Sequence, residues 1–218
     1  MTDDSNSNSN PAPSQGNVIR KLAEYLACAP GTLKRALEHQ AKIGSDETNL
    51  PRIGQILQEL GIISAEELES AIRRQRADRL RQCYVFSSLT QPELTALSMR
   101  FREVTVPEGY QFIIQDEEDP TLYVLASGKA EVYRTDIDGN WLHIAYLEQS
   151  EPIGEMGYFD PSGRRSASVR AVERSELLCA SYSDLTHYFE NVPRVANDFM
   201  KLVKKRKDAI DELLHQAT

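Results

Sequence analysis

The sequence predicts an α+β protein: a small N-terminal helical repeat domain followed by an antiparallel, jelly-roll-like β-roll with flanking helices and a long C-terminal helix. Three observations predict this order. Apolar residues recur at helical spacing over residues 17–80, short alternating strands separated by turn residues follow, and a second apolar helical stripe occupies residues 193–216. Many short antiparallel strands at even spacing are typical of a closed roll or barrel.

The composition narrows the function classes. The net charge is −8 and 40% of the residues are hydrophobic. Nucleic-acid binding needs a concentrated positive surface, so we expect no direct DNA binding. The N-terminus does not resemble a signal peptide, and no apolar run reaches the about 20 residues that span a bilayer. We therefore expect a soluble, cytoplasmic protein without a membrane span, in which Cys28, Cys83 and Cys179 are reduced thiols.

Residues 1–80 divide into a tail and a repeat. Residues 1–16 are almost entirely polar or small and predict a disordered tail. Residues 17–80 predict helices, with a capping box formed by Ser64 and Glu67. A pattern of five residues occurs twice at an offset of 35: Leu22, Leu33, Ala36, Leu37 and Gln40 match Leu57, Leu68, Ala71, Ile72 and Gln75. We expect a small bundle in which each copy covers the other's apolar face.

The second copy carries a more specific motif. Its residues are Arg52, Ile53, Gly54, Leu57, Gly61, Ile62, Ile63, Leu68, Ile72 and Gln75. This stretch resembles the N-terminal domain of type II secretion and pilus ATPases, whose MshE-type form binds cyclic di-GMP. The resemblance implies cyclic di-GMP binding at these residues. Gln58 departs from the motif, and the first copy has Asn17 where the family has arginine, so a helical adaptor without ligand stays an alternative.

Residues 84–192 predict the β-roll. A lead-in helix begins after Thr90, and the Asp138–Gly139 pair predicts a hairpin turn. The expected strands are 101–106, 110–114, 122–126, 130–135, 141–147, 166–172 and 176–181. Helices are expected at 184–190 and 194–216, and the apolar stripe of the second must lie on its own roll or on another copy of the chain.

One stretch between the strands predicts an anion cradle. It begins with Gly154, Glu155 and Met156 at the start of a short helical turn and returns as Arg165, Ser166 and Ala167. Backbone N–H groups at a helix start attract an anion, and an arginine grips phosphate oxygens through charge-assisted hydrogen bonds. A carboxylate repels phosphate but accepts a hydrogen bond from a sugar hydroxyl. The stretch therefore predicts a nucleotide site.

Residues 84–216 as a whole resemble the cyclic nucleotide-binding domain of the catabolite activator protein and of protein kinase A regulatory subunits. The resemblance implies that Glu155 holds the ribose 2′-hydroxyl and Arg165 the cyclic phosphate, while Gly154, Met156, Ser166 and Ala167 complete the pocket. Ile210 and Asp211 occupy the positions at which the bacterial activator has base-contacting hydroxyl residues. The base therefore stays open, although Ser166 rather than threonine favours cAMP.

We interpret the chain as a non-enzymatic second-messenger receptor without a cofactor. Its expected ligand is cAMP, with cyclic di-GMP as a second candidate, and its expected partner is a transcription factor or a secretion or pilus component. A homodimer through the C-terminal helix is a further expectation. The alternatives are a ligand-free adaptor and a DNA-binding regulator. The acidic charge opposes the second, as does the absence of a helix-turn-helix domain before Thr218, and the basic run at 204–207 is interpreted as a solvated helix face.

Overall fold

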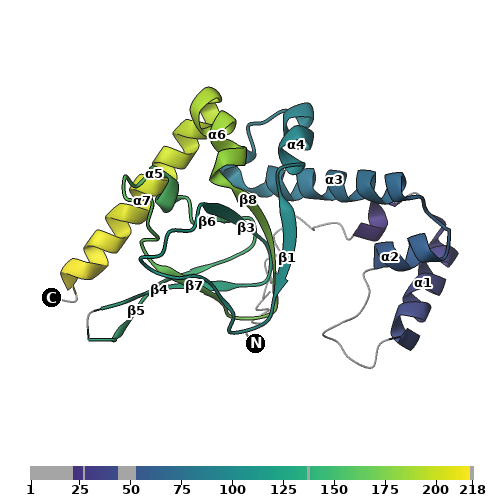
Figure 1. Cartoon of the computed structure of the whole chain (residues 1–218), viewed down its shortest axis with the longest axis horizontal. Coiled ribbons are helices and arrows are strands. Elements are labelled where there is room, and N and C mark those ends of the chain that lie inside the picture. Colours follow the sequence, from purple (N-terminus) through teal and green to yellow (C-terminus); the bar gives the residue numbers. More distant parts are fainter. Residues whose placement is uncertain (1–21, 27, 44–52, 137, 217–218) are drawn as a thin grey trace, which may run out of the picture.

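Two four-stranded antiparallel sheets face one another in the computed structural model, and helices lie at one side of this sandwich and along it (Figure 1). The structure describes residues 22–26, 28–43, 53–136 and 138–216, so the predicted tail 1–16 lies outside the described residues. The predicted α+β, jelly-roll-like architecture with flanking helices and a long C-terminal helix is confirmed.

Within the described residues, the N-terminal part has four helical segments. They are η1 (Leu22–Glu24), α1 (Pro30–Ile43), α2 (Ile53–Glu59) and α3 (Ala65–Gln82). Ser64 caps α3: its backbone N–H donates to Glu67 Oε2 at 2.7 Å and its hydroxyl accepts from the Glu67 N–H at 3.1 Å, which confirms the predicted capping box. The equivalent repeat residues Ala36 and Ala71 are both fully buried in one apolar cluster. The two copies therefore pack against each other, as the repeat predicts.

Helix α3 connects this bundle to the β-roll. Ala71, near its middle, belongs to the N-terminal cluster, whereas Ala77 and Leu80 belong to the core of the second part. Arg79, from the same helix, pairs with Glu176 on a strand of the roll, with 2.8 Å between Nη2 and Oε2. One continuous helix thus contributes to both apolar cores.

The eight strands of the described residues form two sheets around an apolar interior. The first sheet has the order β1 (Arg102–Val106), β8 (Ser175–Ser181), β3 (Thr121–Ser127), β6 (Pro152–Ile153). The second has the order β2 (Gln111–Ile113), β7 (Ser168–Ala171), β4 (Ala130–Thr135), β5 (Trp141–Leu147). All seven predicted strands are present: β4 and β5 have the predicted bounds, and the other five have shifted ends. Strand β6 was not predicted, because two residues are too few to show an alternation.

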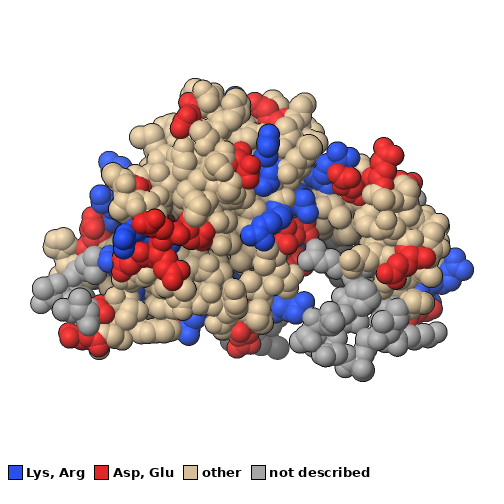
Figure 2. Space-filling view, viewed as in Figure 1, with Lys and Arg blue, Asp and Glu red and all other residues tan. Residues whose placement is uncertain are grey.

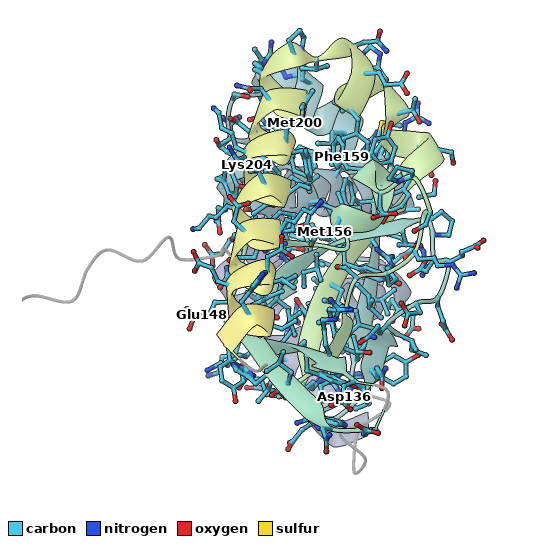
Figure 3. The ribbon with its side chains drawn as sticks, turned by 90° about the vertical axis from the view of Figure 1, so that its left-hand side faces the viewer. Asp136, Glu148, Met156, Phe159, Met200 and Lys204 are labelled. Atoms are coloured by element: carbon cyan, nitrogen blue, oxygen red, sulfur yellow. The ribbon has the colours of Figure 1, made fainter. Side chains whose placement is uncertain are left out.

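Five further helical segments accompany the two sheets within the described residues: η2 (Tyr84–Phe86), α4 (Gln91–Ser98), α5 (Met156–Phe159), α6 (Tyr182–Asn191) and α7 (Pro193–Gln216). Helix α7 runs along the molecule beside α5, as Figure 3 shows for Met200, Lys204 and Met156. Its apolar stripe is buried within the same chain, with Val195 and Phe199 fully covered and Ile210 nearly so. Of the two predicted positions for this stripe, the structure shows the one on its own roll. The homodimer stays a prediction.

Surface charge is mixed. Acidic and basic side chains are interspersed on the face that Figure 2 draws. No described helix is both long enough and apolar enough to cross a lipid bilayer. The cytoplasmic location stays a prediction.

Candidate functional site

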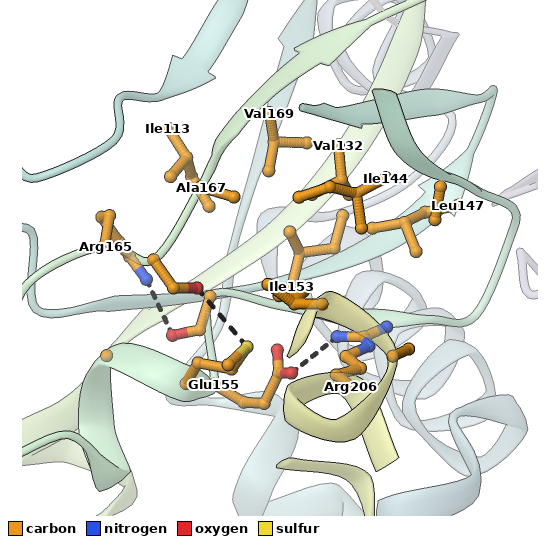
Figure 4. A pocket seen from close by; sticks show the side chains of 17 residues that line it. Ile113, Val132, Ile144, Leu147, Ile153, Glu155, Arg165, Ala167, Val169 and Arg206 are labelled. Carbon is orange, nitrogen blue, oxygen red and sulfur yellow. Dashed lines mark hydrogen bonds and ion pairs between the residues drawn. The ribbon is translucent and has the colours of Figure 1, made fainter. Parts of the chain in front are cut away.

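A cavity of about 140 Å³ lies between the second sheet, the α5 segment and helix α7 (Figure 4). The sheet contributes an apolar wall formed by Ile113, Val132, Ile144, Ala145, Leu147 and Val169. Helix α7 contributes Arg206, Ala209 and Ile210. The six residues predicted to form the anion cradle all border the same cavity. We call them the cassette: Gly154, Glu155, Met156, Arg165, Ser166 and Ala167. The structure therefore brings together two segments of the chain. Gly154 of the first and Arg165 of the second are eleven residues apart in sequence and are hydrogen-bonded.

Gly154 is required by its surroundings. Its φ is +87°, which side-chain-bearing residues rarely adopt, and a Cβ there would lie 2.2 Å from Arg165 Nη1. The Gly154 carbonyl accepts hydrogen bonds from Arg165 Nη1, at 2.7 Å, and from the Tyr182 hydroxyl. The glycine thus lets the backbone of the cassette approach the arginine directly.

Arg165 is almost completely enclosed, with 2% of the residue exposed. Besides Gly154, its Nη1 donates to the Tyr182 hydroxyl at 2.8 Å, and its Nη2 donates to Asp119 Oδ2 at 2.7 Å and to the Thr121 carbonyl at 2.5 Å. Burial raises the pKa of Tyr182 to about 12, so this hydroxyl stays protonated. The buried Arg165 Nε donates to no described group. The guanidinium is therefore fixed in place while one of its donors is unused.

Glu155 is held by an arginine that the sequence analysis did not select. Arg206 of α7 donates from Nη1 to Glu155 Oε1 at 2.8 Å and to the Pro152 carbonyl at 2.7 Å. Side-chain exposure is 21% for Arg206 and 2% for Glu155. Burial by itself would lower the pKa of Arg206, but the Glu155 carboxylate outweighs it and the pKa is raised. Arg206 is therefore charged, and its hydrogen bond to Glu155 joins α7 to the cassette.

A signal for Arg206 was present in the sequence. It lies four residues from both Leu202 and Ile210, which are buried members of the apolar stripe of α7. Lys204, Lys205 and Lys207 are exposed, as expected for a solvated basic run, but Arg206 is not. Helical periodicity applied to the charged residues would have separated it from its neighbours.

The part of the cavity left for a base is apolar. Of the two predicted lid residues, Ile210 borders the cavity and is 7% exposed, whereas Asp211 is exposed and does not border it. Ser166 Oγ lies 3.4 Å from Met156 Sδ. The polar side chains of the lining are those of Glu155, Arg165, Ser166 and Arg206. The arrangement can bind a phosphate and a sugar hydroxyl through charged groups and a flat ring through apolar contact.

The N-terminal motif has a different geometry. Arg52 lies outside the described residues. A Cβ on Gly54 would lie 2.5 Å from Leu68 Cδ1, so this glycine lets α2 approach α3. Gly61 ends α2 with φ +65°, and the Ile62 N–H donates to the Leu57 carbonyl at 2.9 Å, which is a Schellman ending. Gly54 therefore has a packing role, and Gly61 has a helix-ending role.

The remaining motif residues do not share one cavity. Leu57, Ile63 and Gln75 are buried, while Ile53 is partly buried against the same cluster. Leu68 and Ile72 border one groove, whereas Ile62 and Ile63 border another. Within the described residues, no group of three or more His, Cys, Asp or Glu side chains could hold a metal ion.

The fold and the cavity together define a β-roll whose cavity is covered by a helix. Residues 103–191 match the family model of the cyclic nucleotide-binding domain, and this part of the chain has that fold. The chain is similar to the "Cyclic AMP receptor protein" of Thermus thermophilus, with 33% identity over 122 residues that cover 56% of each chain. It is also similar to the "cAMP-activated global transcriptional regulator CRP" of Salmonella typhimurium, with 29% identity over 106 residues.

Solved structures agree on the fold. The catabolite activator protein of Thermus thermophilus superposes with a TM-score of 0.54 at 31% identity, covering 61% of this chain and 62% of that one. The cAMP-bound PfPKA-R structure superposes with a TM-score of 0.59 at 16% identity, covering 73% of this chain and 52% of that one. The chain spans about half the length of the curated relatives it matches, 56% and 50% for the two named above.

Proposed function

We propose that the chain is a second-messenger receptor that binds cAMP in the cavity of the β-roll and passes the signal to a protein partner. The observation that carries the proposal is the pair of Glu155 and Arg165 at one cavity, each with bonding capacity left. Arg165 Nε donates to no described group, and Glu155 Oε2 accepts from none. The arginine would bind the cyclic phosphate, and Oε2 would accept the ribose 2′-hydroxyl.

Adenine is the proposed base for two reasons. Ser166 favours cAMP, and curated relatives that match this chain are named as cAMP receptors and cAMP-activated regulators. The apolar wall around Val132, Ile144 and Ile210 offers contact to either purine ring and no side-chain hydrogen bond to its edge. We therefore expect cGMP to compete with cAMP, with a preference set mainly by Ser166.

Helix α7 is the proposed output element. Arg206 connects it to Glu155, so a ligand that bonds to Glu155 acts on a carboxylate already attached to the helix. At the N-terminal end of α7, Arg194 donates to Glu93 of α4 at 2.5 and 2.6 Å. A signal requires that the ligand bind two arrangements of this helix with different affinity. The recipient would be a transcription factor or a secretion or pilus component.

A ligand-free adaptor is the second candidate, and one observation favours it. Both Nη atoms of Arg165 already have partners in the chain, and Asp119 neutralises its charge. Cyclic di-GMP at the N-terminal motif stays a prediction of the motif, because Gly54 packs against Leu68, Gly61 ends α2, and Arg52 lies outside the described residues.

A thermal-shift panel separates these candidates. The full chain and its variants Glu155→Gln and Glu148→Gln are each heated with cAMP, cGMP, cyclic di-GMP or 5′-AMP. A specific ligand at 100 times its Kd stabilises by about 2.7 kcal/mol. We expect this for cAMP with the wild type and with Glu148→Gln, whose parent carboxylate is exposed, and a much smaller shift with Glu155→Gln. If none of the four nucleotides raises the Tm of the wild type, the ligand-free adaptor is the function that remains.

A further inference from the structure

A second and larger cavity, of about 400 Å³, lies between β1 and β2, which are edge strands of the two sheets. We call it the β1–β2 groove. Its apolar lining includes Val104, Tyr110, Phe112, Ile114 and Tyr123. Tyr110 and Ile114 are 52% and 44% exposed, so large apolar side chains stand at its mouth. The groove shares no lining residue with the nucleotide cavity.

One part of the groove is acidic. Glu117 and Asp119 border it, and Arg102 borders it without an ion pair to either carboxylate among the described residues. Asp119 Oδ2 accepts from Arg165 Nη2 at 2.7 Å and from the Tyr123 hydroxyl at 3.3 Å. Asp119 Oδ1 accepts from no described group, and the side chain is 29% exposed. This carboxylate can therefore bind a second cation besides Arg165.

The groove is also tied to the cassette through the backbone. Glu117 and Asp119 lie on the loop that follows β2. The Arg165 N–H donates to the Glu117 carbonyl at 3.0 Å, and the Asp116 N–H donates to the Arg165 carbonyl at 2.9 Å. A ligand that moves this loop must act on Arg165 at both its backbone and its side chain. The groove and the phosphate-binding arginine are thus mechanically connected.

We infer that the β1–β2 groove binds a peptide of a protein partner, placing an apolar side chain against Phe112 and Tyr123 and a basic side chain on Asp119. The choice of a basic side chain follows from charge complementarity with Asp119 and Glu117. A cation on Asp119 weakens its hold on Arg165 Nη2 and leaves that donor for a phosphate oxygen. Peptide binding therefore strengthens nucleotide binding, and nucleotide strengthens peptide binding by the same factor. This coupling, unlike the groove itself, rests on the proposed function.

The groove is tested without nucleotide. The probes are an acetylated, amidated Phe-Arg dipeptide and its neutral Phe-Gln counterpart, titrated into the labelled full chain and followed by amide NMR. We expect shifts around Tyr110, Ile114 and Asp119, and Phe-Arg to bind about fivefold more tightly, as a partly exposed ion pair allows. Asp119→Asn should make the two dipeptides equal. Equal binding of both dipeptides to the wild type, or shifts elsewhere only, would overturn the site.

A matched pair of double variants keeps the test independent of Asp119. Tyr110→Ala with Ile114→Ala removes two exposed groove residues and should weaken Phe-Arg binding at least about tenfold. Tyr146→Ala with Val172→Ala removes two comparably exposed residues outside the groove, 52% and 37% exposed, and should leave it unchanged. Equal effects of the two double variants would also overturn the site.

The coupling is measured by calorimetry of cAMP with and without saturating Phe-Arg dipeptide. We expect the cAMP Kd to fall by about fivefold or more, the lower end of typical allosteric coupling. An unchanged Kd contradicts the coupling alone. A complete lack of cAMP binding in both conditions contradicts the proposed function together with the coupling, while the NMR result for the groove stands separately.

Discussion

The ion pair between Arg206 and Glu155 makes the most specific prediction about how α7 is joined to the site. Replacing Arg206→Met keeps the aliphatic stem and removes the two hydrogen bonds to Glu155 and Pro152. Glu155, 2% exposed, is then left as a buried carboxylate without its cation. Removing one partner of a buried pair costs about 3–5 kcal/mol, and the partial exposure of Arg206 places this case near 3 kcal/mol.

The same change should affect both stability and binding. A loss of about 3 kcal/mol lowers the Tm of a chain of this size by about 6–12 °C. The affinity for cAMP should fall by about tenfold, the equivalent of one hydrogen bond, because Arg206 no longer orients Glu155 for the ribose. Differential scanning calorimetry and isothermal titration with cAMP measure the two effects.

A double-mutant cycle decides whether the pair is responsible. Arg206→Met is combined with Glu155→Gln, and the coupling free energy should exceed about 1.5 kcal/mol. Lys205→Met is the control, since Lys205 is the exposed neighbour on the same helix and its loss should cost less than about 0.5 kcal/mol. A coupling near zero, or equal destabilisation by Arg206→Met and Lys205→Met, would refute the role of this pair.

Two further predictions concern the cassette backbone and the acid stability. Gly154→Ala should cost about 1–3 kcal/mol in thermal unfolding and abolish cAMP binding, because its Cβ would meet Arg165 Nη1 at 2.2 Å. Gly139→Ala is the control, because Gly139 also has a positive φ but no neighbouring atom within 4 Å of an added Cβ. This variant should show the backbone cost alone and bind cAMP normally. Equal loss of cAMP binding in both variants would contradict the clash with Arg165. Hydrogen bonds from the Thr90 backbone and hydroxyl and from Arg194 lower the pKa of Glu93 from 4.5 to about 2. The contribution of Glu93 to stability is therefore complete above about pH 4.5 and disappears as the pH falls to about 2. Glu93→Gln should flatten this part of the profile of stability against pH. A profile unchanged by the substitution would contradict this role of Glu93.

The sequence predicted the fold well because its signals are local. Alternation marks the strands, Ser64 and Glu67 mark a helix start, and glycine with aspartate marks the hairpin at residue 139. Strand β6 was not predicted because its two residues, Pro152 and Ile153, form no alternation of their own. They pair with Val124 and Tyr123 only in the folded chain. Elements defined by tertiary pairing alone have no local signal.

The site was predicted where a motif carries it and missed where packing does. Gly154 to Ala167 were selected as one cassette, and all six selected residues border one cavity. Asp119 was missed because it meets Arg165 from 46 residues away, through a loop without a distinctive pattern. Arg206 was missed because three exposed lysines surround it in the sequence.

Calorimetry of cAMP binding tests the central claim most directly. The proteins are the wild type, Arg165→Ala and Arg164→Ala, the last being a matched control because the Arg164 side chain is 57% exposed. We expect one cAMP per chain for the wild type and for Arg164→Ala, and an affinity at least about 100-fold lower for Arg165→Ala, since a buried, charge-assisted phosphate contact is lost. No binding to the wild type, or equal binding to all three proteins, would contradict it.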